Sequence, residues 1–210
     1  MRTKGAANAR VPVEAVGNIA ATARSWQVAT DEELLRAMAG GDTVAFDELF
    51  VRHSASVLTF LSRLVISRCD PEDLLQETFL RVLTHAKDFR PGAALRPWLF
   101  TIARNIAINA LKKSKQRSDL EVQTDLADWK FSTQDDLSDP SSHLELQEQK
   151  TRLLAALQAL PPPHREILVL IIFDGFSYKE TATITGEPEN TLRSRVFYAL
   201  RKLRKLLKES

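Results

Sequence analysis

The amino-acid sequence predicts an all-α protein made of two small helical domains that a flexible acidic linker joins. Apolar residues recur at the spacing of an α-helix through most of the chain, and strand-like alternation is absent. One polar, acidic stretch without a sustained period interrupts this pattern. With 210 residues, of which 44% are hydrophobic and 27% charged, the chain is long enough to build two such cores.

Residues 1–27 are predicted to be a flexible N-terminal extension. They mix Ala, Val and Arg and lack the continuous apolar core of a secretory signal. No apolar run approaches the roughly 20 residues that a membrane-spanning helix needs, so no membrane insertion is expected. The single cysteine, Cys69, excludes an intramolecular disulfide and a cysteine cluster for zinc. We therefore expect a cytoplasmic protein without a metal or another cofactor.

Residues 28–117 are predicted to form the first domain, a bundle of four helices. Asp31 can cap the first helix, which ends at the Gly40-Gly41 pair, and Asp42 can cap the second. Asp70 starts the third, because a capping carboxylate is followed there by proline in the first turn. The expected apolar positions of the four helices are Leu34, Leu35 and Met38; Phe46, Leu49, Phe50, Val57, Leu58 and Leu61; Leu74, Leu75, Phe79, Val82 and Leu83; and Leu95, Trp98, Leu99, Ile102, Ala103, Ile106 and Ala110.

Residues 118–142 are predicted to be the linker, and Pro140 and the two serines after it break its end. Residues 119–150 hold nine acidic residues against two lysines, a net charge of about −7 in a chain of net charge +2, so the remainder carries about +9. Basic stretches lie on either side, which favours a polyanionic ligand. Trp129 and Phe131 in the linker can dock on a partner or on one of the domains, and both interpretations stay open.

Residues 143–208 are predicted to form the second domain. Its expected helices are 144–160, 165–173, 177–185 and 188–208. Ser177 and Glu180 fit a capping box at the start of the third helix, and Gly186 makes the turn that follows it. A helix, a short turn with glycine and a longer basic helix together indicate a helix-turn-helix, over residues 178–197 and onward.

The last helix is amphipathic and basic. At about 100° per residue, an apolar face forms that should pack on the preceding helices; it contains Leu192, Val196, Ala199, Leu200 and Leu203. The opposite face contains Asn190, Ser194, Phe197, Arg201, Arg204, Lys205 and Lys208. Arg193 and Arg195 flank it, and either can pair with guanine. A solvated basic helix with Phe197 packed on a neighbour is the alternative, and the helix-turn-helix favours duplex DNA.

Three stretches resemble the extracytoplasmic-function (ECF) sigma factors of the sigma-70 family: "DPEDLLQETFLRVL" (70–83), "RPWLFTIARNIAINAL" (96–111) and "LPPPHREILVLIIFDGFSYKETATITGEPENTLRSRVFYALRKL" (160–203). The likeness covers roughly residues 30–208. It implies a non-enzymatic promoter-recognition subunit of RNA polymerase, which acts in a stress or envelope response. The implied partners are the β and β′ subunits of the polymerase core, promoter DNA and an anti-sigma factor.

The resemblance also implies three sets of site residues. Binding to the polymerase core, through a motif at 73–86, would involve Asp73, Leu74, Gln76, Glu77 and Phe79. Binding to the melted −10 element would involve Arg104, Asn105, Asn109, Lys112 and Lys113. Binding to the −35 duplex would involve Asn190, Thr191, Arg193, Ser194, Arg195, Phe197, Tyr198 and Arg201. The chain departs from the family at Glu187, Glu189 and Tyr198, where less acidic or more basic residues are usual.

Two other functions compete with this interpretation. A stand-alone helix-turn-helix regulator would share the last domain, but such proteins normally carry a receiver or ligand domain in front, whereas here "DLLQETF" and "TIARN" precede it. An enzyme would need an active site. The histidines at 53, 85, 143 and 164 are scattered and are expected at the surface or in the linker, and a glycine-rich phosphate loop is absent.

Overall fold

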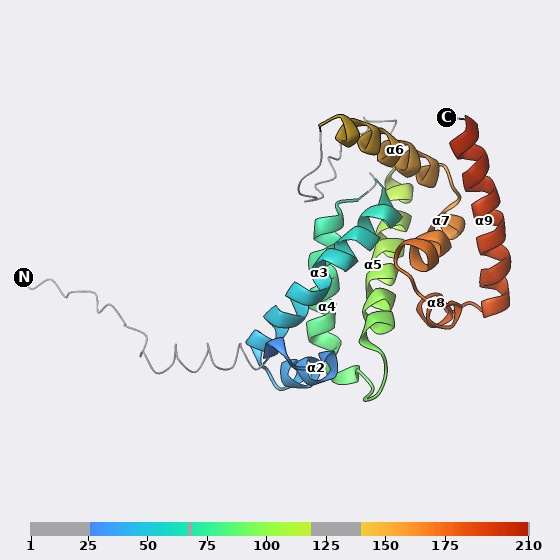
Figure 1. Cartoon of the computed structure of the whole chain (residues 1–210). Coiled ribbons are helices and arrows are strands. Elements are labelled where there is room, and N and C mark those ends of the chain that lie inside the picture. The colour runs from blue at the N-terminus through green and yellow to red at the C-terminus, as the bar shows by residue number, and fades with distance from the viewer. Residues whose placement is uncertain (1–25, 67–68, 119–139, 210) are drawn as a thin grey trace, which may run out of the picture. The chain divides into compact units, whose positions relative to one another are not determined.

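The computed structural model describes residues 26–66, 69–118 and 140–209, and these residues form helices and no strand (Figure 1). The predicted all-α class is therefore confirmed. The elements are α2 (Asp31–Ala39), α3 (Thr43–Val65), α4 (Pro71–His85), η1 (Ala86–Asp88), α5 (Leu95–Ser118), α6 (Pro140–Gln158), α7 (Pro162–Leu168), η2 (Val169–Phe173), α8 (Tyr178–Thr185) and α9 (Glu189–Glu209). Trp129 and Phe131 lie outside the described residues.

Contacts divide the chain into two compact units. Among the described residues, the first holds 26–53 together with 83–93, and the second holds 54–66, 69–82, 94–118 and 140–209. The first unit thus contains α2, the start of α3 and η1, and the second contains α5 to α9. The predicted boundaries at 28–117, 118–142 and 143–208 remain predictions.

Within the first unit, Thr30 rather than Asp31 caps α2. Thr30 has an extended backbone, its hydroxyl accepts a hydrogen bond from the Glu33 amide at 3.3 Å, and the Glu33 carboxylate accepts one from the Thr30 amide at 2.7 Å. This is a complete capping box. Asp31 lies one position inside the helix, and its carboxylate instead pairs with Arg52 and His53 of α3. The predicted end of this helix at Gly40 is confirmed.

Arg52 ties the start of the described chain to α3. Its guanidinium donates to the backbone oxygens of Trp26 and Ala29 at 2.7 Å and of Gln27 at 3.0 Å. The Trp26 indole nitrogen also donates to Asp42 at 3.2 Å. Residues 26 and 27 are helical. The folded part of the chain therefore includes two residues that were predicted to belong to the flexible extension.

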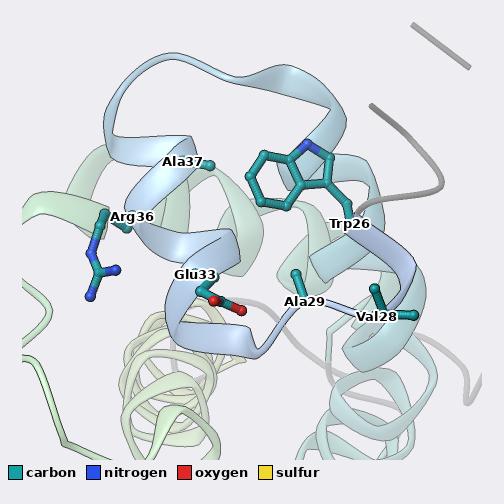
Figure 2. A pocket seen from close by; sticks show the side chains of 6 residues that line it. All are labelled: Trp26, Val28, Ala29, Glu33, Arg36 and Ala37. Atoms are coloured by element: carbon teal, nitrogen blue, oxygen red, sulfur yellow. The ribbon is translucent and has the colours of Figure 1, made fainter. Parts of the chain in front are cut away.

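A groove of about 580 Å³ lies beside this segment. Figure 2 shows the six residues that line it, which are Trp26, Val28 and Ala29 ahead of α2 and Glu33, Arg36 and Ala37 on α2 itself. Val28 is 87% exposed at its edge. None of the residues predicted to bind polymerase or DNA lines this groove.

The predicted starts of α3 and α4 are confirmed by their caps. The Asp42 carboxylate accepts hydrogen bonds from the amides of Val44 and Ala45, at 2.9 and 3.1 Å. The Asp70 carboxylate accepts one from the Glu72 amide at 2.8 Å. Along α4 the prediction of Leu83 as a core residue is wrong, because this side chain is 45% exposed.

Thr78 occupies the buried position that the apolar pattern of α4 does not explain. Its side chain is fully buried, and its hydroxyl donates to the Leu74 carbonyl oxygen at 2.7 Å. This bond inside the helix satisfies the polar group, so a threonine can lie in an apolar core. The buried stripe of α4 thereby continues from Leu74 to Val82 without Leu83.

Prolines begin two helices of the second unit earlier than predicted. α6 begins at Pro140 instead of residue 144, and α7 begins at Pro162 instead of Arg165. Proline suits the first turn of a helix, where its missing N–H has no partner to lose. The stretch predicted as one helix to Phe173 is α7 followed by the π-helical turn η2. Such a turn needs a change of hydrogen-bond register that apolar periodicity does not reveal.

The helix-turn-helix has the predicted local structure. Ser177 and Glu180 form both bonds of the capping box at the start of α8. Gly186 ends α8 with φ of +74°, in the left-handed region that favours glycine. The Pro188 carbonyl oxygen accepts from the Leu192 amide at 3.1 Å, so α9 begins directly after this proline.

Helix α9 packs against α6, α7 and α8, and Figure 1 shows it in red beside the orange α7 and α8. Two buried clusters hold it there: Leu157, Leu160, Leu168 and Ala199 form one, and Ile167, Leu192 and Val196 form the other. The prediction that Leu200 belongs to the buried face is wrong. This leucine is 41% exposed, because it lies at the edge of the apolar stripe.

A buried arginine joins three segments of the second unit. Arg165 is 6% exposed and donates to the backbone oxygens of Leu64 at 3.0 Å, Leu157 at 3.1 Å, Gln158 at 3.2 Å and Leu160 at 3.3 Å. These oxygens lie near the C-terminal ends of α3 and α6, where helices have carbonyls without a partner. The guanidinium thus stabilises both helix ends.

Candidate nucleic-acid interface

The outward face of α9 is exposed as predicted. Its exposed members among the predicted DNA contacts are Asn190, Thr191, Arg193, Ser194, Phe197, Tyr198 and Arg201. Phe197 and Tyr198 are 64% and 57% exposed, with ring centroids 5.6 Å apart in an edge-on arrangement. Aromatic rings that remain exposed on a basic helix can contact thymine methyl groups without leaving a core.

Arg193 points away from the core near the start of α9. Its side chain is 60% exposed, and its guanidinium lies 4.5 Å from the centre of the Tyr178 ring of α8. The Glu189 carboxylate, one turn earlier, is 3.8 Å away. An exposed pair of this kind is weak, so Arg193 can exchange it for a base edge.

Arg195 is held inside the protein, in contrast to Arg193. Its Nη1 donates to Glu187 at 2.8 Å, and its Nη2 lies 2.7 Å from the other carboxylate oxygen, at ion-pair distance but without hydrogen-bond alignment. Only 23% of its side chain is exposed. Burial, and then the charges of Lys202 and Arg195, lower the pKa of His164 on α7.

The polar face of α5 exposes four of its five predicted contacts. Asn105, Asn109, Lys112 and Lys113 are exposed, and amides next to cations suit single-stranded bases and their backbone. Arg104 differs from them, because its Nε forms an ion pair with Glu166 of α7 and only 18% of its side chain is exposed. Trp98 is half-buried, consistent with the expected packing role.

Helix α4 exposes the acidic and amide members of its predicted motif and buries the apolar ones. Asp73, Gln76 and Glu77 are exposed, whereas Leu74 and Phe79 are 6% and 2% exposed. The two buried side chains belong to the core, so they cannot contact a partner directly in this structure.

Two exposed leucines on α4 were missed as candidates for a contact. Leu80 is 62% exposed and lies on the same helix face as Asp73 and Glu77, at positions i, i+4 and i+7, and Leu83 is 45% exposed. For Leu80 the signal in the sequence was a leucine off the apolar stripe, whereas Leu83 was predicted to lie on that stripe. The face of α4 thus combines carboxylates with an apolar anchor.

The histidines whose side chains the structure describes differ in their exposure. His53 was expected at the surface, but its Nε2 lies 2.9 Å from Asp31 and 15% of its side chain is exposed; His164 is also half-buried. The side chain of His143 lies outside the described part of the chain, and His85 is exposed. Within that part, no three His, Cys, Asp or Glu side chains are grouped to hold a metal ion, and no helix has the length and apolar character to cross a bilayer.

Two family models match the chain. The model described as Sigma-70 region 2 matches residues 49–117, and the model described as Sigma-70, region 4 matches residues 150–203. Together they cover more than half of the chain. The first match contains α4 and all of α5 but its last residue, and the second contains the helix-turn-helix.

Named relatives extend the likeness along the chain. RNA polymerase sigma factor CarQ of Myxococcus xanthus is 39% identical over 165 residues, which is 79% of this chain and 90% of CarQ. ECF RNA polymerase sigma factor EcfG of Rhodopseudomonas palustris is 39% identical over 137 residues, which is 65% of this chain and 70% of EcfG.

Solved structures agree with the fold. CnrH, solved in complex with the cytosolic domain of CnrY, is 25% identical with a TM-score of 0.63, over 86% of this chain and 98% of that one. The sigma factor RpoE of Bartonella quintana, solved with the anti-sigma factor NepR, is 27% identical with a TM-score of 0.64, over 78% of this chain and 96% of that one.

Proposed function

This chain belongs to the ECF branch of the sigma-70 family of RNA polymerase sigma factors, and we propose how its three exposed surfaces divide the work of initiation. Helix α9 binds the −35 duplex, α5 binds the melted −10 strand, and α4 binds the polymerase core. The exposed basic and aromatic face of α9 at the end of a helix-turn-helix is the observation that carries this proposal.

The −35 contact follows from the order of side chains along α9. Arg193 lies near the N-terminal end, where the recognition helix of this motif approaches base edges. Lys205 lies twelve residues further on, about three turns along the helix. Arg193 therefore contacts bases, and the later cations contact phosphates, which position the helix without selecting a sequence.

The −10 contact uses the exposed amides of α5. Asn105 and Asn109 are one turn apart, and Lys112 and Lys113 continue the same exposed side toward the C-terminus. Amides can hydrogen bond to the edges of unstacked bases, while the lysines attract the backbone. We assign base recognition to Asn105, on the family resemblance and its exposure.

The core contact uses the exposed side of α4. Asp73 and Glu77 supply negative charge and Leu80 an apolar surface, and such a combination suits a basic partner surface with an apolar pocket. Phosphodiester chemistry then belongs to the polymerase, and this chain needs no active site of its own. A subunit of that enzyme works in the cytoplasm, where we place the chain.

An anti-sigma factor is the expected regulator. RpoE of Bartonella quintana, which resembles this chain over most of its length, was solved with such a partner. A protein that covers α4 or α9 would block the surfaces that polymerase or DNA requires. We therefore expect a partner of this class to hold the chain inactive.

The assignment of α9 is tested with reconstituted holoenzyme on a set of promoters that differ in the −35 element. Arg193→Ala should cost about 1–3 kcal/mol at the preferred sequence and flatten the preference among variants. Lys205→Ala should weaken all sequences about equally and lower the slope of binding against salt by about one. The orientation of α9 is wrong if Arg193→Ala shifts every promoter equally while Lys205→Ala changes their ranking.

A further inference from the structure

Two carboxylates stand at the start of α9, next to the side chains that would enter the DNA groove. Glu187 precedes the helix and Glu189 is its first residue. Each is paired with an arginine of the same helix: Glu187 with Arg195, and Glu189 with Arg193. Close to DNA, an acidic side chain meets phosphates of the same sign, so its presence there weakens binding unless a specific contact offsets it.

The two pairs differ in how firmly they are held. Glu187 and Arg195 meet through both carboxylate oxygens at 2.8 and 2.7 Å, and only 30% and 23% of their side chains are exposed. Glu189 and Arg193 are 3.8 Å apart, with 44% and 60% exposed. The first pair is short, half-buried and contains one aligned hydrogen bond, whereas the second is an exposed contact that a ligand can open.

The firm pair keeps one arginine away from DNA. Arg195 Nη1 donates to the Glu187 carboxylate, eight residues earlier in the chain, across the start of α9. For Arg195 to reach a phosphate, Glu187 would have to give up a half-buried partner. Glu187 thus reduces the number of cations that α9 offers to any DNA sequence.

The exposed pair of Glu189 and Arg193 affects which base α9 prefers next to the guanine. When Arg193 turns to a guanine, Glu189 loses its partner and remains near the groove as a carboxylate without a donor. Of the base edges in the major groove, the amino groups of cytosine and adenine can donate to it, and cytosine is the usual partner of glutamate. Phosphates and the oxygen of guanine or thymine repel it.

We propose that Glu187 and Glu189 are specificity-determining residues of the −35 interface: Glu187 withholds Arg195 from DNA, and Glu189 selects cytosine beside the guanine that Arg193 contacts. The inference rests on the proposed −35 function of α9. These roles explain why two acidic residues stand at the start of α9 although the rest of the helix is strongly basic.

The test uses holoenzyme and a pool of duplexes that carry a pre-opened bubble and randomised base pairs in the −35 region. Bound DNA is sequenced, and affinity for the unselected pool is measured at several salt concentrations. The variants are Glu187→Gln and Glu189→Gln, which keep the shape and remove one charge. Glu148→Gln, at an exposed position of α6, is the matched control, because it removes the same charge from a different helix. Circular dichroism verifies that each variant is folded.

Wild type should enrich a guanine and a neighbouring cytosine. Glu189→Gln should lose the cytosine preference or move it to adenine, which glutamine recognises, and keep the guanine. Glu187→Gln should raise the affinity for the unselected pool about two- to five-fold, as expected for release of one ion pair, and steepen the salt slope by about one. Glu148→Gln should change neither.

The outcomes separate the inference from the function on which it rests. If both glutamine variants enrich the same bases as wild type with the same salt slope, the inference is wrong, even though Arg193→Ala still abolishes the guanine. A wild-type enzyme that enriches no −35 base would overturn the −35 function and the inference together.

Discussion

Replacing Asp174 by asparagine should stabilise the fold at neutral pH. Asp174 follows η2, and only 7% of its side chain is exposed. One carboxylate oxygen lies 3.9 Å from Arg63, and the other is buried without a hydrogen-bond partner among the described residues. Burial raises the pKa of this carboxyl from 3.8 to about 6, although Arg63 and Arg96 act in the opposite direction. Ionised Asp174 is therefore costly in the folded state.

The magnitude follows from the two pKa values. Because the folded pKa is the higher one, the folded state binds the proton more tightly, and stability from this group is present below pH 3.8 and is lost as pH rises through about 6. The difference between the pKa of 3.8 and the pKa of about 6 corresponds to about 3 kcal/mol of folding free energy at most, since one pKa unit is about 1.4 kcal/mol. Asparagine has the same shape as aspartate and never ionises. Asp174→Asn should therefore raise the free energy of unfolding by about 1–3 kcal/mol at pH 7.5 and by about half as much at pH 5.

Thermal unfolding followed by circular dichroism at pH 5 and pH 7.5 measures this gain. An increase of about 2–4 °C in the midpoint is expected for each kcal/mol in a chain of this size. Asp88→Asn, at an exposed position of η1, is the matched control and should not change the midpoint at either pH. A gain that is equal at both pH values, or a loss at pH 7.5, would show that Asp174 is not costly when ionised.

Three further changes test the other surfaces and the turn. Asp73→Ala with Glu77→Ala should weaken competitive binding to core polymerase with an unchanged circular dichroism spectrum, since both side chains are exposed; undiminished binding contradicts the role of α4. Asn105→Ala should impair opening of the −10 element, measured by permanganate footprinting, and leave core binding intact; a normal bubble argues against base recognition. Gly186→Ala should cost about 1 kcal/mol in thermal unfolding, because φ is +74° there although space for a Cβ is open.

Local signals in the sequence determined where several helices begin and end. The caps at Asp42 and Asp70, the capping box of Ser177 with Glu180, and the turn at Gly186 all match the structure. Each of these interactions joins residues within three or four positions, so the chain contains all the information that is needed. The α2 cap was placed one residue late, because Thr30 and Asp31 are both good capping residues and only the backbone of Thr30 is extended.

Periodicity determined which face of α9 is exposed, but not its edges. Phe197, Arg193 and Ser194 lie outward as predicted, whereas Leu200 at the margin of the apolar stripe is 41% exposed. Leu83 on α4 was likewise predicted to lie on the apolar stripe, and it is 45% exposed. A helical pattern locates a face only to within about one residue, or 100°, and the width of the neighbouring helices decides whether a marginal side chain is covered.

Only the tertiary structure decided the partners of the charged residues. Arg104 pairs with a glutamate 62 positions away, and Arg165 donates to the oxygen of Leu64, 101 positions away. Arg193 and Arg195 are two residues apart and equally basic in the sequence, yet Glu187 holds one and leaves the other exposed. A charge can be paired by any segment that folding brings within about 4 Å. Composition and spacing along one helix therefore predicted a basic surface, and the packing of α7, α8 and α9 selected the arginines that remain available on it.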